Sequence, residues 1–254
     1  MCSSDLIDDE TRRALVAQNP AVAEAVKPFI VGRDIRRYRL DGGAQYLLYM
    51  FHGVDASRYP SVLEHLRPFR DRLEGRATEQ AWYELQQPQY RFSKYIDAPK
   101  IVFPDIAKGP RFAMDLAGHY GSNTIYFIPL EDYFLLGLLN SSLSRFYFES
   151  VCAGLEGGDE VYLRFFGQYM EGFPVPRICT DDRGLADTVQ RMTALAKQRA
   201  SLEAELAAAS TPLDVQTLGR QATVLDGMLD RLVWELYGLT VGEIAVVRAS
   251  FDER

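Results

Sequence analysis

The chain has 254 residues, of which 47% are hydrophobic and 12% aromatic, so it can bury a core and is not disordered throughout. Its 28 basic and 35 acidic side chains leave a net charge of −7. The sequence contains no uninterrupted apolar run long enough to predict a membrane-spanning helix. The 3 cysteines are widely spaced, which is typical of reduced thiols in a cytoplasmic protein.

Residues 1–26 are predicted to form a helical lead-in to the rest of the chain. Asp8–Gln18 has acidic residues in its first turn and ends before Asn19-Pro20, and a second short helix is expected at Ala21–Val26. The stretch Cys-Ser-Ser-Asp-Leu at positions 2–6 matches one reading frame of a common sequencing adapter. We therefore hypothesise that these first residues are not native.

Residues 27–178 are predicted to form a mixed β-sheet module with embedded helices. Runs rich in β-branched and aromatic residues alternate with proline and glycine, and the expected strands are Gln45–Phe51, Lys100–Phe103, Thr124–Ile128 and Val161–Phe166. Two helices interrupt them: Tyr59–Glu74, with a kink at Pro68, and Leu130–Phe148, which is apolar nearly all round and should be buried. We expect Asn140 to be a buried hydrogen-bonding residue there, because an unpaired amide in such a helix would be costly.

Residues 179–254 are predicted to form a helical arm. A helix is expected at Arg183–Ala209, and Thr211-Pro212 then has the pattern of an N-cap followed by a first-turn proline. The next helix carries a heptad seam of Leu218, Ala222, Leu225, Leu229, Leu232 and Leu236, so the two helices should form an antiparallel hairpin that stops at Gly238. A capping box at Thr240–Glu243 predicts one last short helix. The fold class is therefore α+β, a mixed-sheet module followed by a helical hairpin.

One segment is basic in this acidic chain. KPFIVGRDIRRY, at 27–38, opens residues 27–76, which carry 10 basic and 6 acidic side chains. This concentration predicts a localised anion-binding face, because phosphate neutralisation depends on where charge lies rather than on its total. Gly32 is expected to allow a tight turn that aims the arginines along one edge. The alternative is an ordinary surface in which Arg33 and Arg37 form ion pairs with Asp34 or Asp41.

The motifs of several enzyme classes are missing from the sequence. His52, His65 and His119 lack partners at zinc-ligand spacing, and there is no glycine-rich phosphate loop. The sequence also has no Asn/Asp-Pro-Pro-aromatic loop of an adenine amino-methyltransferase and no acid-x-Lys triplet of a common metal-dependent nuclease. We therefore assign no catalytic residue, metal or cofactor to this chain.

The basic segment resembles the entry signature of the TaqI-like C-terminal specificity domain, the target-recognition module of bacterial restriction–modification DNA methyltransferases. Similar motifs follow in the family's order: Tyr59-Pro60 with Leu66–Leu73 and Arg76, Trp82–Leu85, Pro99–Pro104, Arg111–Ala113 with Asp115, Leu138–Ser141 and Leu232–Thr240. The resemblance implies a C-terminal fragment of an adenine-specific methyltransferase, in some members fused to a nuclease. It also implies that S-adenosylmethionine binds in the parent protein, and that double-stranded DNA and a methyltransferase domain, in cis or in trans, are the partners.

On this resemblance, residues can be assigned to two kinds of DNA contact. Expected contacts to the DNA backbone are Lys27, Arg33, Arg36, Arg37 and Lys100. Candidate base contacts lie in two loops, at 86–94 and 108–123, and are Gln86, Gln87, Gln89, Arg91, Lys94, Arg111, Ser122 and Asn123. The alternative for each is an ordinary solvated loop residue. Trp82 and Tyr83 are expected in the core rather than stacked on a base.

Two other functions stay open on the sequence alone. One is a complete enzyme with an unrecognised nuclease or methylase centre, which labelled S-adenosylmethionine would reveal by methyl transfer to DNA. The other is a protein–protein adaptor in which the helical arm carries the function and the basic segment is incidental. The adaptor predicts no binding to a DNA duplex at low salt.

Overall fold

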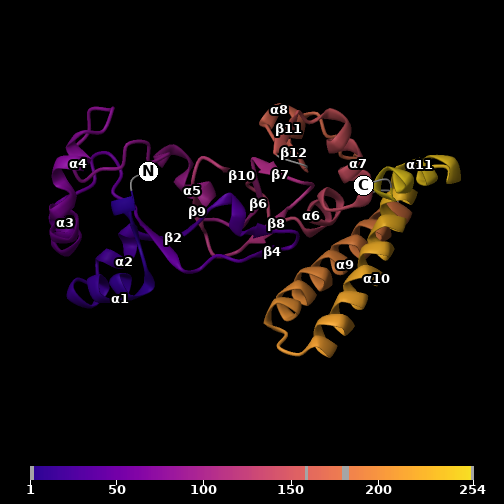
Figure 1. Ribbon diagram of the computed structural model, residues 1–254, viewed down its shortest axis with the longest axis horizontal. Coiled ribbons are helices and arrows are strands. Elements are labelled where there is room, and N and C mark those ends of the chain that lie inside the picture. Colours follow the sequence, from indigo (N-terminus) through magenta and orange to yellow (C-terminus); the bar gives the residue numbers. More distant parts are fainter. Residues whose placement is uncertain (1–2, 158–159, 179–182, 253–254) are drawn as a thin grey trace.

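The computed structural model describes residues 3–157, 160–178 and 183–252. It has the expected α+β architecture (Figure 1), with α1–α4 at one end, small mixed sheets in the middle and the hairpin of α9 and α10 at the other end. No helix in the described ranges combines the length and apolar character needed to cross a membrane.

The first sheet has four strands. Their order is β1 (Leu6–Ile7), β5 (Gln45–Leu48), β2 (Val26–Ile30) and β9 (Tyr120–Gly121), with β2 and β9 parallel and the other pairs antiparallel. Helices α1 (Asp9–Gln18) and α2 (Val22–Ala25) share a core with β5 and the next helix, α3 (Pro60–Leu66). Val26, the last residue of the predicted lead-in, is the first residue of β2.

Local sequence signals place the helices of this end. Asp8 accepts a hydrogen bond from the backbone of Thr11 at 2.8 Å and so caps α1. The predicted kink at Pro68 is present: α3 gives way to a 3-10 turn, η4 (Arg67–Phe69), and then to α4 (Arg70–Glu74). Proline lacks the amide hydrogen that would continue the helix. A further 3-10 turn, η3 (Ala56–Arg58), precedes α3.

The middle of the molecule contains two three-stranded sheets and a short ribbon. One sheet has the strand order β10 (Ile125–Ile128), β6 (Lys100–Pro104) and β8 (Ala113–Asp115). The other has the order β11 (Gly154–Gly157), β12 (Glu160–Arg164) and β7 (Ile106–Ala107). The ribbon pairs β3 (Ile35–Arg36) with β4 (Arg39–Leu40). All pairs are antiparallel, and β6 is buried along its whole length. The four predicted strands are confirmed to within a few residues. A 3-10 turn, η2 (Gly32–Asp34), leads into the ribbon.

The predicted helix at 130–148 is wrong in one respect, because it is two helices. α6 (Tyr133–Leu139) ends at Asn140, and α7 (Ser142–Val151) begins with Ser141 as its cap. The Asn140 amide donates to the Phe112 carbonyl at 2.9 Å, and its oxygen accepts from the Phe112 backbone at 3.2 Å. Asn140 is only 3% exposed, so its predicted role as a buried hydrogen-bonding residue is confirmed.

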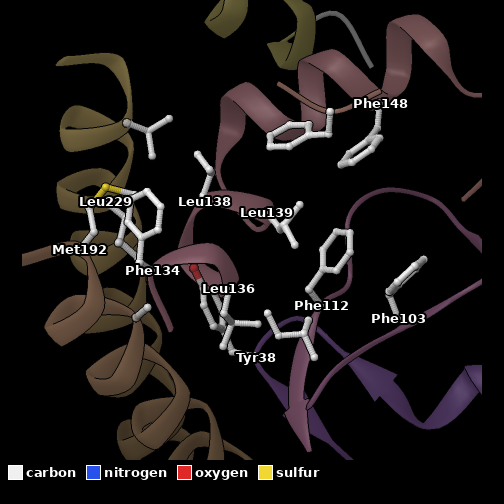
Figure 2. Packing of buried hydrophobic residues seen from close by; sticks show 14 of the residues in the cluster. Tyr38, Phe103, Phe112, Phe134, Leu136, Leu138, Leu139, Phe148, Met192 and Leu229 are labelled. Atoms are coloured by element: carbon white, nitrogen blue, oxygen red, sulfur yellow. The ribbon is translucent and has the colours of Figure 1, made fainter. Parts of the chain in front are cut away.

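The largest core joins the sheets to the helical hairpin. Figure 2 shows Phe134 and Leu138 of α6 on the side of Met192 and Leu229, and Leu139 near Phe112. On the right in Figure 2, Phe103, Phe112 and Phe148 form an aromatic cluster, with ring centroids of Phe103 and Phe112 5.2 Å apart. The short helix α8 (Gly167–Glu171) follows β12.

The C-terminal helices are as predicted. α9 (Arg183–Ala208) and α10 (Pro212–Leu236) lie side by side (Figure 1). Of the heptad seam, Ala222, Leu225, Leu229 and Leu232 are buried. Thr211 caps α10 by accepting from the Asp214 backbone at 3.1 Å. Gly238, with φ of 63°, ends it in the left-handed conformation that favours glycine. Thr240 and Glu243 cap each other at the start of α11 (Val241–Asp252).

Candidate nucleic-acid interface

The two predicted recognition loops meet around one cleft of about 810 Å³. The loop at 86–89 and the loop at 119–123 line it from different parts of the chain, and Leu47, Tyr49 and Val102 contribute apolar walls. Of the residues predicted to contact bases, five line the cleft: Gln86, Gln87, Gln89, Ser122 and Asn123. Amides and hydroxyls both donate and accept hydrogen bonds, so this cleft can read the edge of a base.

Two hydrogen bonds hold the first loop against the residues that follow strand β5. Leu85 donates to the Met50 carbonyl at 2.7 Å, and the Tyr49 hydroxyl donates to the Pro88 carbonyl at 2.7 Å. The loop then turns at Gln89, whose φ of 52° lies in the left-handed region. A non-glycine residue pays a steric cost there. Gln89 is thus held in a specific, strained turn at the rim of the cleft.

The second loop is organised by the buried carboxylate of Asp115. This carboxylate accepts from the His119 backbone at 2.8 Å and from the Ala117 backbone at 3.0 Å, and its Oδ1 lies 2.8 Å from His119 Nδ1. Burial alone would raise the pKa of Asp115, but the hydrogen bonds from His119 and Lys100 lower it to about 2. Asp115 therefore remains ionised, and it fixes the loop that carries Ser122 and Asn123.

The structure corrects the assignment of Lys100 to the DNA backbone. Lys100 is 1% exposed, its ammonium forms an ion pair with Asp115, and it donates to the Ile96 carbonyl at 2.6 Å. An ammonium enclosed in this way is not available to a phosphate. Its role is to neutralise the Asp115 carboxylate beneath the cleft, because either charge alone would be costly to bury.

The structure also corrects the assignment of Arg37. Its guanidinium donates twice to the Asn140 carbonyl, at 2.7 and 3.1 Å, and once to Asp226 of α10 at 2.6 Å. Its neighbour in the ribbon, Arg39, pairs with Asp41 at 2.6 Å and with Glu203 of α9 at 3.5 Å.

Arg199 completes this network from within the hairpin. It is only 6% exposed, it pairs with both Asp226 and Glu203, and its guanidinium lies 5.2 Å from the ring centroid of Tyr38. Arg37 approaches the same ring at 5.1 Å. This part of the basic segment therefore joins the sheet module to the helical hairpin.

Arg33 and Arg36 of the basic segment are more open to solvent than Arg37, whose side chain is 34% exposed, whereas the Lys27 side chain is only 24% exposed. Arg36 pairs with Asp41 at 3.0 Å but keeps 43% of its side chain exposed, and Lys27 pairs with Asp97 at 3.1 Å. Arg33 is exposed, and no ion pair joins it to another described residue. Gly32 contributes by close approach, because a Cβ there would lie 3.0 Å from the Thr124 carbonyl oxygen. Arg33 therefore directly follows a residue packed on the second loop.

Aromatic rings near the cleft were not predicted as functional residues. Tyr90 and Phe92, in the 3-10 turn η5 (Tyr90–Phe92), are 55% and 50% exposed. Tyr95, in α5 (Ser93–Ile96), is 41% exposed, and Tyr126 of β10 is 37% exposed. Phe92 and Tyr126 line the cleft itself. The available signal was the aromatic spacing in 90–95, which alternates with cationic residues as in surfaces that bind nucleic acid.

The other predicted base contacts lie outside the cleft. Arg91 and Lys94 are exposed on the aromatic segment, and neither has an ion pair with any described residue. The Lys94 ammonium lies 4.7 Å from the ring centroid of Tyr95. Arg111 is half-buried and lies two residues before β8. Trp82 and Tyr83 pack against the core of the first sheet, as expected.

The described residues contain no group of histidine, cysteine and carboxylate side chains that could hold a metal ion. The chemistry that the cleft does offer is hydrogen bonding from amides and stacking on rings, with cations at its edge.

Residues 27–175 match the TaqI-like C-terminal specificity domain family. The chain belongs to this family. The match contains both predicted recognition loops and every strand except β1 and the first residue of β2, and all residues that line the cleft except Asp5 lie within it.

Similar proteins extend well beyond this specificity domain. The Type II methyltransferase M.MjaIV of Methanocaldococcus jannaschii is 30% identical over 139 residues, which are 49% of this chain and 47% of that protein. M.PaeR7I of Pseudomonas aeruginosa is 27% identical over 195 residues, 74% of this chain and 28% of that protein. The chain thus spans about half or less of these relatives.

A solved structure has a similar fold over nearly the whole chain. It is the Type IIL restriction–modification enzyme MmeI in complex with DNA, with a TM-score of 0.63 and 15% identity. The superposition covers 98% of this chain and 34% of that enzyme. The arrangement of sheets and helical hairpin therefore occurs as one part of a larger protein.

Proposed function

We propose that this chain recognises a specific double-stranded DNA sequence for a restriction–modification adenine-N6 DNA methyltransferase. The observation that carries the proposal is the meeting of two loops, far apart in the sequence, around one cleft of a TaqI-like specificity domain. Their amide and hydroxyl side chains are suited to base edges, where each good bidentate contact discriminates by about 1–3 kcal/mol.

The proposal divides the contacts between affinity and specificity. Arg33, Arg36, Arg91 and Lys94 bind phosphates, because their side chains are wholly or partly exposed. Lys27 belongs with them only if its ion pair with Asp97 opens on binding. The base-reading residues are Gln86, Gln87, Gln89, Ser122 and Asn123, with Arg111 as a further candidate outside the cleft.

The methyl transfer belongs to another part of the proposed parent enzyme. That part, linked in cis or acting in trans, would bind S-adenosylmethionine as the methyl donor, and no residue of this chain is assigned to it. The helical hairpin, fixed to the sheet module through Arg37 and Arg199, is suited to hold the specificity domain at a defined distance from its partner. We place the complete protein in the cytoplasm, where the DNA is.

Selection from a pool of randomised duplexes tests the proposal. The chain is expected to enrich one short site, and Gln89→Ala or Asn123→Ala should relax the preference at one position about 5- to 150-fold while retaining non-specific affinity. Gln221→Ala, which removes an exposed amide from α10, is the matched control and should change nothing. Unchanged site preference in both cleft variants would contradict this assignment, and no duplex binding at low salt would favour the adaptor.

A further inference from the structure

His119 is a polar residue of the cleft to which the sequence analysis assigned no function. It directly precedes β9 in the second recognition loop, shortly before Ser122 and Asn123. It lines the cleft, and 12% of its side chain is exposed. Its imidazole is therefore placed where a ligand of the cleft can reach it.

The buried carboxylate of Asp115 fixes both the orientation and the tautomer of this imidazole. Asp115 Oδ1 lies 2.8 Å from His119 Nδ1, and the same carboxylate accepts from the His119 backbone at 2.8 Å. An ionised carboxylate can only accept hydrogen bonds, so Nδ1 is the donor. Because the Lys100 ammonium already balances the charge of Asp115, a neutral imidazole completes the cluster. In a neutral imidazole that donates from Nδ1, Nε2 is an acceptor.

The Nε2 atom of His119 is left without a protein partner. No hydrogen bond joins it to any residue in the described ranges. It lies beside Gly42, where a Cβ would be 3.7 Å from Nε2 and 2.3 Å from Ile30 Cγ2. A side chain at 42 would clash with Ile30, so glycine leaves space next to Nε2. A fixed acceptor in a largely buried position gains from a donor supplied by a ligand.

This acceptor differs from the loop amides in what it can distinguish. The amide of Gln86 or Asn123 presents a donor and an acceptor and can turn to suit either kind of group. Nε2, with its tautomer fixed, can only accept. On the edges of base pairs the exocyclic amino groups donate, whereas the ring nitrogens and carbonyl oxygens accept. Nε2 therefore favours a base that presents an amino group and disfavours one that presents a carbonyl.

We propose that His119 is a specificity-determining residue, whose Nε2 accepts a hydrogen bond from the exocyclic amino group of one base in the target site. Asp115 is then a positioning residue, because it orients the imidazole without touching the base. This inference rests on the proposed function and deepens it, since it adds a reading residue and names the base group that this residue requires.

Removing amino groups from single bases tests the contact directly. The probe is the duplex that the wild-type chain enriches from the randomised pool. In this duplex each adenine is replaced in turn by purine, each cytosine by 2-pyrimidinone and each guanine by hypoxanthine, all of which lack the exocyclic amino group. Fluorescence anisotropy measures the affinity for each probe. At the position that His119 reads, the wild-type chain should lose about 2- to 13-fold in affinity, the equivalent of one neutral hydrogen bond.

His119→Asn separates reading from positioning. The side-chain nitrogen of asparagine can take the place of Nδ1 and keep the bond to Asp115, whereas nothing replaces Nε2. This variant should bind arbitrary duplexes as before and lose the amino-group penalty at one position only, and His119→Ala should lose the same penalty. His65→Asn is the matched control, because His65 is also half-buried but does not line the cleft. Circular dichroism checks the fold, and His119→Ala decides the question if the asparagine variant is unstable.

The possible results distinguish this inference from the proposed function. If every amino-group penalty persists in both His119 variants, the imidazole reads no base and the inference fails, while sequence recognition by the cleft stands. Penalties that shrink together at all positions also overturn it, because that is the effect of a loosened loop. If the wild-type chain enriches no site and binds no duplex at low salt, the inference and the proposed function both fail.

Discussion

Replacing Lys100 tests whether this residue supports the cleft or contacts DNA. The pKa of Asp115 falls from 3.8 to about 2, which corresponds to about 2 kcal/mol of stability from the groups around the carboxylate. Lys100→Met removes the cation and leaves the carboxylate buried, so we expect a larger loss, about 3–5 kcal/mol. Asp115→Asn should also lower the stability, because it leaves the Lys100 ammonium buried without its carboxylate. The double variant should lose less than the sum of the two single variants.

Urea denaturation at neutral pH measures these losses, and acid provides a second test. Because the pKa of Asp115 is lowered on folding, its contribution is complete above about pH 4 and disappears as the pH falls towards 2. The wild type should lose stability in that window, and Asp115→Asn should lose less. The opposite result would be that Lys100→Met leaves the stability unchanged and reduces the salt dependence of DNA binding by about one charge. Lys100 would then contact phosphate after all, and the correction above would be wrong.

Three further outcomes follow from other contacts. Asn140→Leu leaves the backbone N–H and carbonyl of Phe112 unpaired in the core, so urea denaturation should show a loss of about 2–5 kcal/mol; a loss below about 1 kcal/mol would contradict this. Arg36→Ala and Arg91→Ala should each weaken binding to all duplexes alike and reduce the salt dependence by about one charge. Titrations by fluorescence anisotropy that show unchanged affinity at every salt concentration would rule out the contact. Gln89→Gly removes the strain of a left-handed residue, so thermal unfolding should show equal or slightly higher stability, while site selection loses a base preference; lower stability would refute the strain.

The features predicted correctly from the sequence are those with local signals. The caps of α10 and α11, the kink at Pro68 and the heptad seam each depend on residues within a few positions of one another. Asn140 was also predictable, because a lone amide in an apolar stretch requires a partner. Its partner was not: Phe112 lies 28 positions away, and the amide interrupts the helix that the apolar pattern predicted as continuous.

The candidate site was predictable only in its parts. The sequence analysis selected the two loops, but their meeting around one cleft depends on long-range pairing, in which β9 lies parallel to β2 and brings Tyr120 beside Phe29. The ion-pair partners of the arginines in the basic segment likewise depend on contacts between residues far apart in the sequence. Arg37 binds Asp226, which is 189 positions away, and no local pattern encodes that distance.

The ion pairs of the basic segment show why a count of charges along the sequence does not locate a nucleic-acid surface. With 35 carboxylates for 28 cations, an acidic chain can satisfy most of its arginines internally, and Arg37, Arg39 and Arg199 are used in this way. Among the described residues, Arg33, Arg91 and Lys94 stay exposed, so on the proposed function we expect counterion release to contribute modestly to affinity. On the proposed function, discrimination between sequences would then come from hydrogen bonds in the cleft, which are less sensitive to salt than phosphate contacts. A specificity domain with these properties binds weakly to arbitrary DNA, and that weakness increases the relative advantage of its target site.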